Sequence, residues 1–443
     1  MLGNDREWFP PFRLVSGFAG RLITRYLFNH PQRGSFTLGV GVRSEAKGEA
    51  LRKALGFDET VLVIQVDAGQ YEQVEAVVKG AKVVISAVGP YWTCGEAIAK
   101  ACAEHGKKYV DLTGEPHFVR RVIDLYDEIA MKTGAVLVPA CGLESLPSDI
   151  LVHLSNETLK TALGPSAELG LSESFWSVKF NYAFGSMALL RGAYEEAPRV
   201  KVKEAAREYA LSPVRGVPSP SVRGPRRVPF SQPPAYGTYF LMGIINRAIV
   251  QRTFGLNQIA RIGAKSPPSE TCADMDDKLR SLDYGPTFRY VEYLADEDRG
   301  FCAALYFGVS ILTYVVLLTL SPFRWYYKKF SAKPGQGPSN AALENGSFTV
   351  TNYTVSASAP LTRAKSTVRG TGNPGYLLTS VMAGESALCL LLDEDSLPVM
   401  TRRGGVLTPA TAFGRAIVRR LEQSGRMRFE TEIVDQDEGG KQR

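Results

Sequence analysis

Residues 16–21 have the sequence Ser-Gly-Phe-Ala-Gly-Arg and directly precede an apolar stretch with helical periodicity at 22–28. A glycine-rich turn at the start of a helix lets backbone N–H groups approach a pyrophosphate closely. Gly17, Phe18 and Gly20 are therefore candidate cofactor-binding residues. The turn alone is a weak signal, because glycines often precede helices, and its weight comes from the pattern that follows.

Strand and helix patterns alternate from residue 12 to residue 150. Short apolar or β-branched runs are predicted to be strands, at 36–42, 61–66, 83–88, 109–112 and 135–139. The stretches between them have helical periodicity, at 44–55, 71–78, 96–105 and 118–132. This alternation predicts a parallel sheet covered by helices.

The ends of the second and third predicted strands add candidate cofactor residues. Arg43 and Ser44 follow the second strand. An acid there favours the 2′-hydroxyl of NAD, whereas an arginine favours the 2′-phosphate of NADP, so this pair predicts NADP. The alternative is a solvated cap at a helix start. Asp67, at the end of the third strand, is placed either to touch adenine or to cap a helix.

The end of the fourth strand carries Gly89, Pro90 and Tyr91. Ligands of open α/β sheets lie at the carboxyl ends of strands, and small residues there let a cofactor come close. Tyr91, with Trp92, either forms a wall beside the nicotinamide or is a plain packing aromatic.

Candidates for acid–base chemistry follow the next strand. Asp111 or Glu115 is placed for proton transfer, although Asp111 equally suits a turn cap. Cys141 is interpreted as a small apolar filler rather than a nucleophile, and His117 and His153 as structural. No catalytic residue is assigned. No metal site is expected, because the six cysteines make no CxxC pair and the chain has four histidines.

Beyond residue 150 the composition changes. Residues 197–234 hold eight prolines, and eight Lys or Arg face two Glu within 197–227. Such a stretch is typical of a basic surface loop, with contact to anionic lipid as the alternative.

Residues 301–323 contain no charged residue and are followed by mixed aromatic and cationic residues. This pattern indicates a membrane contact, with a buried core helix as the alternative. The strands predicted after residue 346 are expected to complete a sheet begun before residue 300. We therefore expect the segment to lie in one leaflet rather than to cross the bilayer.

Overall composition is that of a globular protein. The chain has 443 residues, 44% hydrophobic and 22% charged, with a net charge of +7. These values exclude a disordered chain, a fibre and a polytopic membrane protein. The mild basicity permits an anionic surface or cofactor but does not require nucleic acid, and none is expected. The first twenty residues show no signal-peptide pattern, so reduced, cytosol-facing thiols are expected.

Together these motifs resemble the saccharopine dehydrogenase-like oxidoreductases, which include the bacterial trans-acting enoyl reductases and eukaryotic membrane and lipid-droplet proteins. The matching segments lie at 16–21, 41–44, 87–91, 95–97, 109–115, 141–149, 372–376 and 404–409. The resemblance spans about 14–425. It implies an α/β fold with NADP as cofactor and a Rossmann domain with a parallel sheet at 1–150. The resemblance also implies a second α/β domain, for the substrate, formed by 151–195 and 336–425. A hydrophobic, membrane-associating insertion at 196–335 interrupts this domain, and a polar tail follows at 426–443.

The resemblance also implies a function. We expect an NADP-dependent oxidoreductase of lipid metabolism that reduces an enoyl or carbonyl group of a lipid or hydrophobic substrate. We expect it on the cytosolic face of a lipid droplet or endomembrane, with a homodimer as an expected assembly. The alternative is a non-catalytic, membrane-associated nucleotide-binding protein. Saccharopine dehydrogenase activity ranks third, because no Arg/Lys cluster for three carboxylates is evident.

The sequence departs from the family pattern at two places. Leu14 stands where the first glycine belongs, and 7–13 contains Pro10 and Pro11, which cannot donate to a ladder. The first strand is therefore expected to be missing or distorted, as in a truncated start, and cofactor binding to be poor. A glycine-rich stretch expected near 183–195 is reduced to Ala-Phe-Gly-Ser-Met.

Overall fold

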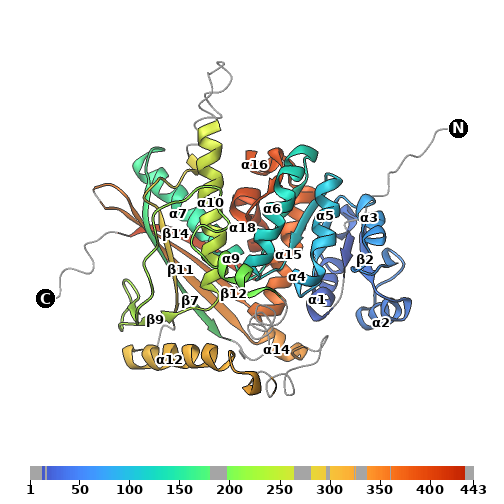
Figure 1. Cartoon of the computed structure of the whole chain (residues 1–443), viewed down its shortest axis with the longest axis horizontal. Coiled ribbons are helices and arrows are strands. Elements are labelled where there is room, and N and C mark those ends of the chain that lie inside the picture. Colours follow the sequence, from blue (N-terminus) through green and yellow to red (C-terminus); the bar gives the residue numbers. More distant parts are fainter. Residues whose placement is uncertain are drawn as a thin grey trace.

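The computed structural model describes residues 12–14, 17–179, 197–263, 281–295, 300–323, 325, 337–359 and 361–434. Ser16 of the glycine turn, the stretch near 183–195 and most of the aromatic and cationic residues after 323 lie outside the described residues. Within the described part, two seven-stranded sheets form the frame. They lie side by side with helices between and around them (Figure 1).

The first sheet has the order β13-β6-β5-β4-β1-β2-β3, and every pair in it is parallel. Its strands are β1 Phe12–Leu14, β2 Leu38–Val42, β3 Val61–Gln65, β4 Val83–Ser86, β5 Lys108–Asp111, β6 Val136–Val138 and β13 Gly405–Val406. All five strands predicted after residue 35 are present. This strand order is that of the dinucleotide-binding fold, so the Rossmann-type sheet is confirmed.

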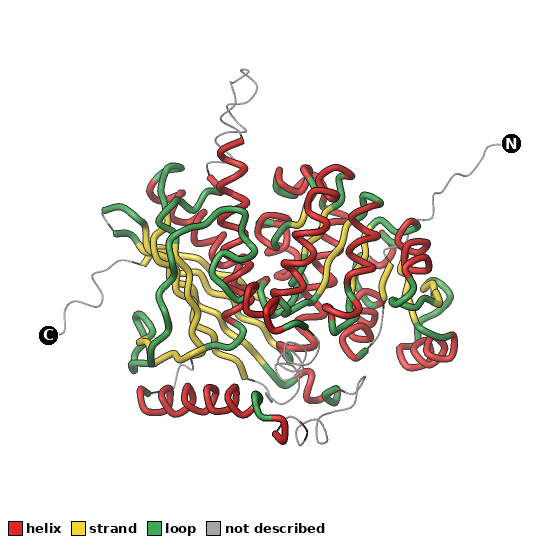
Figure 2. Tube along the Cα trace, viewed as in Figure 1, coloured by secondary structure: helices red, strands yellow, loops and turns green. Residues whose placement is uncertain are grey.

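Helices cover both faces of this sheet (Figure 2). They are α1 Phe18–Phe28, α2 Glu45–Leu55, α3 Tyr71–Lys79, α4 Tyr91–Cys94, α5 Glu96–Glu104 and α6 Pro116–Thr133. Because helices lie on both sides, β2 and β4 are buried along their whole length. The apolar run Val-Val-Ile of β4, without alternation, reflects this two-sided burial.

The first strand is short but present. All three residues of β1 pair with β4, and Leu14 pairs with Gly41 of β2. The strand expected to be missing or distorted is thus present at 12–14, although it has only three residues. Pro10 and Pro11 lie outside the described residues.

The second sheet has the order β14-β12-β11-β7-β10-β9-β8. Its strands are β7 Leu169–Lys179, β8 Arg226–Arg227, β9 Tyr236–Tyr239, β10 Arg289–Ala295, β11 Ser347–Ser356, β12 Arg363–Thr371 and β14 Met427–Val434. Among the described strands of this second sheet, β10 and β7 are the one parallel pair. Both β10 and β11 flank β7, so the strands before and after the apolar segment share one sheet, as expected.

The structure differs from the expected domain boundaries at three places. Gly405–Val406, expected in the second domain, form β13 of the first sheet. Residues 196–335, expected to be an insertion, supply β8, β9, β10 and the helix α10 Gly243–Gly263 to the second half. Residues 426–443, expected to be a polar tail, include β14. Its outward charges pair across the sheet with β12, as in Lys365–Glu432 at 2.8 Å, so a strand with a polar face is stable there.

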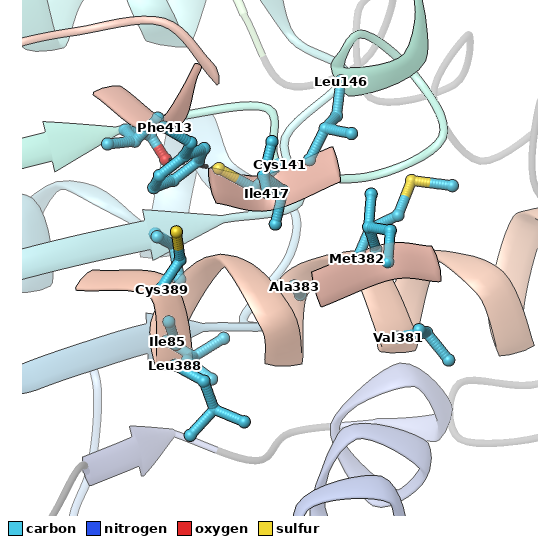
Figure 3. Packing of buried hydrophobic residues seen from close by; sticks show 14 of the residues in the cluster. Ile85, Cys141, Leu146, Val381, Met382, Ala383, Leu388, Cys389, Phe413 and Ile417 are labelled. Atoms are coloured by element: carbon cyan, nitrogen blue, oxygen red, sulfur yellow. Dashed lines mark hydrogen bonds between the residues drawn. The ribbon is translucent and has the colours of Figure 1, made fainter. Parts of the chain in front are cut away.

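The remaining helices fill the space between and beside the sheets. They are α7 Leu146–Leu163, α9 Arg199–Ala205, α12 Phe301–Leu317, α14 Asn340–Glu344, α15 Thr379–Leu392, α16 Val399–Arg403, α17 Pro409–Phe413 and α18 Arg415–Gln423. Figure 3 shows α15 at the centre of the core, where Cys389 and Met382 lie among side chains from both ends of the chain.

Two apolar helices have different environments. Among the described helices, Pro374–Leu392 is the one long and apolar enough to cross a membrane, but 78% of it is buried, so its apolarity serves the core. The helix α12 is shorter. It lies along the margin of the second sheet beside β9, with most of its side chains exposed (Figure 1).

Candidate functional site

The glycine turn presents the amino end of α1 at the centre of the first sheet. Gly17 precedes the first helical residue with φ +152°, a conformation that favours glycine. A Cβ built at Gly17 would meet no atom of the described residues within 4 Å. The first turn contains no acidic residue. Its partial positive charge is therefore available to an anion such as a pyrophosphate.

Phe18 and Gly20 place this helix. The Phe18 ring meets the Tyr376 ring edge-on with centroids 5.1 Å apart. The Arg21 guanidinium lies 5.3 Å from the Phe18 ring centre. Gly20 is buried on the inner side of α1. These contacts join the dinucleotide-binding half to the C-terminal part of the chain.

Arg43 and Ser44 lie together at the carboxyl end of β2. Arg43 is exposed and has no hydrogen bond or ion pair within the described part of the chain. Ser44 is the residue before α2, but its side chain makes no capping hydrogen bond. The hydroxyl and the guanidinium are thus both available to a ligand, and they fit the 2′-phosphate of NADP.

Asp67 follows β3 and is exposed. Its Oδ1 accepts a hydrogen bond of 3.0 Å from the Gly69 backbone N–H, and its own backbone N–H donates to Gln73. This geometry is that of a carboxylate closing a turn. Asp67 therefore closes a turn and is not the helix cap of the alternative, since the residue before α3 is Gln70.

Gly89, Pro90 and Tyr91 connect β4 to α4. The Tyr91 hydroxyl is buried, donates to the Ser86 carbonyl at 2.9 Å and accepts from the Leu112 N–H at 3.2 Å. Burial raises the pKa of Tyr91 well above its ordinary value. The ring therefore ties the ends of β4 and β5 together, which supports the packing alternative. Gly89 is not crowded, because a Cβ there would lie 3.9 Å from the Tyr91 ring.

Asp111 is a buried hub at the end of β5. Its Oδ1 accepts from the backbone N–H groups of Thr113 at 2.9 Å and Ala140 at 2.8 Å, and Oδ2 accepts from the Tyr109 hydroxyl at 2.8 Å. Burial raises its pKa to about 6. Ala140 has φ +58°, an uncommon conformation for a residue other than glycine. Asp111 thus holds the turn after β6 in place, as the turn-cap alternative predicts.

Glu115 joins the loops that follow β4 and β5. Its two carboxylate oxygens accept hydrogen bonds of 2.9 Å from the backbone N–H groups of Tyr91 and Trp92. Both oxygens are therefore occupied by structural bonds, and Glu115 positions the edge of the site rather than serving as a free base.

Cys141 lies in the hydrophobic cluster shown in Figure 3. Its thiol donates to the Val138 carbonyl at 3.2 Å, and burial raises its pKa well above the ordinary value. A thiol of this kind is not a nucleophile at neutral pH, so the filler interpretation holds.

Glu144 is a candidate that sequence reasoning missed. It follows β6, and its enclosed Oε2 has no hydrogen-bond partner among the described residues. Burial raises its pKa to about 7. Perturbed carboxylates at strand ends are typical of functional sites. The position of Glu144 just beyond a predicted strand was the available signal.

Exchange of Glu144 for glutamine is expected to stabilise the protein at high pH. The folded-state pKa lies above the ordinary 4.5, so ionisation in the folded state costs stability as the pH rises from 4.5 through 7. Above about pH 7 we expect the variant to gain on the order of 2 kcal/mol in unfolding free energy, and nothing near pH 4. Urea titrations across this range measure it. The exposed Glu59→Gln is the control. A gain in unfolding free energy that does not depend on pH would contradict the raised pKa of Glu144.

A cavity of about 940 Å³ opens beside the loop after β5. Its polar end includes Gly114, Glu115 and His117, with Arg199 and Lys203 on α9, which packs against α6. A large apolar part of its lining comes from α12 and from the residues just before and at the start of α10: Leu241, Met242, Ile244, Ile245, Leu305, Val309, Ile311, Leu312 and Val315. The cavity thus reaches from the edge of the first sheet to the exposed helix.

Comparison with known proteins gave consistent matches. Residues 15–138 match the family model of the saccharopine dehydrogenase NADP-binding domain. A putative trans-acting enoyl reductase of Mycobacterium tuberculosis is 33% identical, with 96% of this chain and 98% of that protein covered. A trans-acting enoyl reductase of Mycobacterium ulcerans is 31% identical with the same coverage. Saccharopine dehydrogenase (L-Glu forming) from Saccharomyces cerevisiae aligns at 14% identity, with a TM-score of 0.47, over 96% of this chain and all of that one.

Proposed function

This chain belongs to the saccharopine dehydrogenase family of NADP-dependent oxidoreductases, and from that premise we propose that it reduces a hydrophobic, lipid-like substrate at a membrane or lipid-droplet surface. The observation that carries the proposal is the largely apolar 940 Å³ cavity, which begins at the edge of the dinucleotide-binding sheet and is walled by α12. Relatives of this chain are named enoyl reductases, which supports a carbon–carbon double bond next to a carbonyl group as the reacting group.

The residues at the strand ends fit the cofactor. Gly17 and the start of α1 would hold the pyrophosphate, and Arg43 with Ser44 would hold the 2′-phosphate. When bound, NADPH supplies a hydride. Asp111 and Glu115 fix the loops after β4 and β5, which form the edge from which the cavity opens.

An apolar cavity of this kind should select for chain length. Burial of each methylene contributes about 0.8 kcal/mol, or roughly fourfold in kcat/KM, until the chain fills the space. Saccharopine, by contrast, carries three carboxylates and would need enclosed cations to bind them. The cavity's three cations are all exposed, so the cavity does not favour saccharopine: Arg199, Lys203 and Arg223.

NADPH oxidation with 2-enoyl thioesters of increasing length tests the function. We expect kcat/KM to rise with chain length, and Ile311→Asp, in the cavity wall, to abolish that rise. Tyr306→Asp, on the exposed side of the same helix, should leave it unchanged. If NADPH binds but no enoyl or carbonyl lipid of any length is reduced, the alternative of a non-catalytic nucleotide-binding protein replaces this proposal.

The outward side of α12 supports contact with a membrane surface. Tyr306 is 75% exposed and Val316 is 55% exposed, and the helix carries no charged residue. An apolar stripe of this kind is unusual on a surface that faces only water. The helix has 17 residues, about 25 Å, and both flanking strands belong to one sheet, so it suits a single leaflet on the cytosolic side.

The double variant Tyr306→Glu/Val316→Glu is expected to bind phospholipid vesicles about 100-fold more weakly, because two largely apolar side chains no longer enter the leaflet. Flotation of the protein with vesicles measures this, and NADPH affinity should stay unchanged. Ile262→Glu, equally exposed on α10, is the control. Glycosylation tags at positions 200 and 430 should both remain unmodified in cells, and modification of one alone would contradict this topology.

A further inference from the structure

His117 is a buried side chain whose hydrogen-bonding capacity is unused. It lies in the first turn of α6, is 3% exposed and lines the cavity. Neither ring nitrogen has a hydrogen-bond partner among the described residues. The Trp92 ring packs against it, with centroids 5.3 Å apart. Sequence reasoning took this histidine to be structural, because nothing local marks it as functional.

The neighbouring carboxylate does not satisfy His117. Glu115 Oε2 lies 3.4 Å from Nε2, without the alignment of a hydrogen bond, and both Glu115 oxygens already accept backbone N–H groups. The other histidines of the chain each lie closer to a glutamate: His30 at 2.9 Å from Glu385, His105 at 2.8 Å from Glu75 and His153 at 3.3 Å from Glu157. Among the four, His117 is the histidine whose two ring nitrogens are both enclosed and without a hydrogen bond to the described residues.

A buried polar group without a partner is costly and rare in folded proteins, and it marks places where a ligand completes the bonding. His117 lies where the cavity meets the loop held by Glu115, at the cofactor edge of the first sheet. A carbonyl oxygen at the polar end of a long-chain substrate would supply the missing acceptor while its chain occupies the apolar end.

We propose that His117 is a catalytic residue, whose ring N–H binds the carbonyl oxygen of an α,β-unsaturated lipid in this cavity. The assignment rests on the function proposed above. As hydride from NADPH bonds to the β-carbon, the double-bond electrons shift and negative charge develops on the carbonyl oxygen. The His117 N–H stabilises that charge. One proton from water then bonds to the α-carbon and leaves hydroxide, so the alkene gains a hydride and a proton while NADPH becomes NADP⁺.

Ligand binding without turnover gives the first test. Ring nitrogens of four histidines can be resolved by NMR after ¹⁵N-histidine labelling, and the His117 signals are those missing in His117→Phe. We expect a long-chain methyl ketone and an alkane of equal length both to displace a fluorescent fatty-acid probe. The ketone alone should shift the His117 signals. A ketone that binds without moving these signals overturns the role of His117 but leaves the proposed function intact.

Variants give the second test. We expect His117→Phe to lower kcat at least 100-fold with little change in KM or NADPH affinity, and without loss of thermal stability, because it removes an unsatisfied polar group. His117→Gln, whose amide N–H can donate, should recover part of kcat. His153→Phe should lower stability and leave kcat unchanged.

Two results would contradict the role proposed for His117, each in a different way. Unchanged kcat in His117→Phe refutes the catalytic role alone. If NADPH binds but neither ketone nor alkane enters the cavity, the substrate class of the proposed function fails, and the role of His117 fails with it.

Discussion

Exchange of Arg43 for glutamate is expected to weaken NADPH binding about 100-fold and to change NADH binding no more than about threefold. A charge-assisted hydrogen bond to phosphate contributes about 1.5–3 kcal/mol, and the variant replaces it with repulsion between like charges. Arg43 is exposed, at the end of β2, and has no competing partner within the described residues. Its interaction energy is therefore available to the ligand.

Fluorescence titration of both reduced cofactors measures this preference. Because Arg43 is exposed, the difference between the cofactors should shrink as salt is raised. Lys53→Glu, an exposed charge reversal at the other end of α2, is the matched control and should change both affinities little. Equal losses for NADPH and NADH in Arg43→Glu would show that the arginine is only a surface charge.

The residues of the cofactor site that sequence could predict are those defined by local position. Gly17 and Arg43 were identified because each directly follows a strand or precedes a helix, and the structure places both at the same edge of the sheet. The actual bonds of Tyr91 and Glu115 depend on groups about 20 residues away. Such pairings follow from the loops' tertiary arrangement, which no local pattern encodes.

The strands missed by sequence reasoning show the same limit. β13 has two residues and joins the first sheet only by pairing with β6, far away in the chain. The sequence does contain a signal for β14. The apolar residues Met427, Phe429 and Ile433 are separated by two and four residues, which are multiples of the two-residue period of a strand. Its many charges suggested a tail, but on a half-buried sheet they are the outer face.

Apolarity alone does not separate a core helix from a surface helix. Both α15 and α12 are strongly apolar, and the buried one even contains an ionised group. Glu385 of α15 lies 2.9 Å from His30 and 3.1 Å from Arg420, so its charge is compensated inside the core. The absence of charge in 301–323 did single out the exposed helix. The cavity behind it depends on tertiary structure, because α12 packs beside β9 and residues at the start of α10 line the same cavity.

Exchange of Asp111 for alanine is expected to destabilise the fold by about 4 kcal/mol, the largest effect predicted for a single side chain here. Two backbone N–H groups and the Tyr109 hydroxyl would lose their buried acceptor together. Ala140 would also lose a bond that holds its positive φ. Urea unfolding should show a lower midpoint at an unchanged slope.

The variant Asp111→Asn separates the effect of the hydrogen bonds on stability from the effect of the negative charge. Its amide oxygen can still accept from Thr113 and Ala140, and its NH₂ can donate to the Tyr109 hydroxyl, so we expect a loss of only about 1 kcal/mol. Asp124→Ala, which removes an exposed pair with Arg120, should cost less than about 1 kcal/mol. If Asp111→Ala lowered the free energy of unfolding no more than Asp124→Ala does, the turn after β6 would not depend on Asp111.

Because this turn leads to Glu144 and borders the loop that carries Glu115 and His117, Asp111→Ala should also weaken NADPH binding, whereas Asp111→Asn should preserve it.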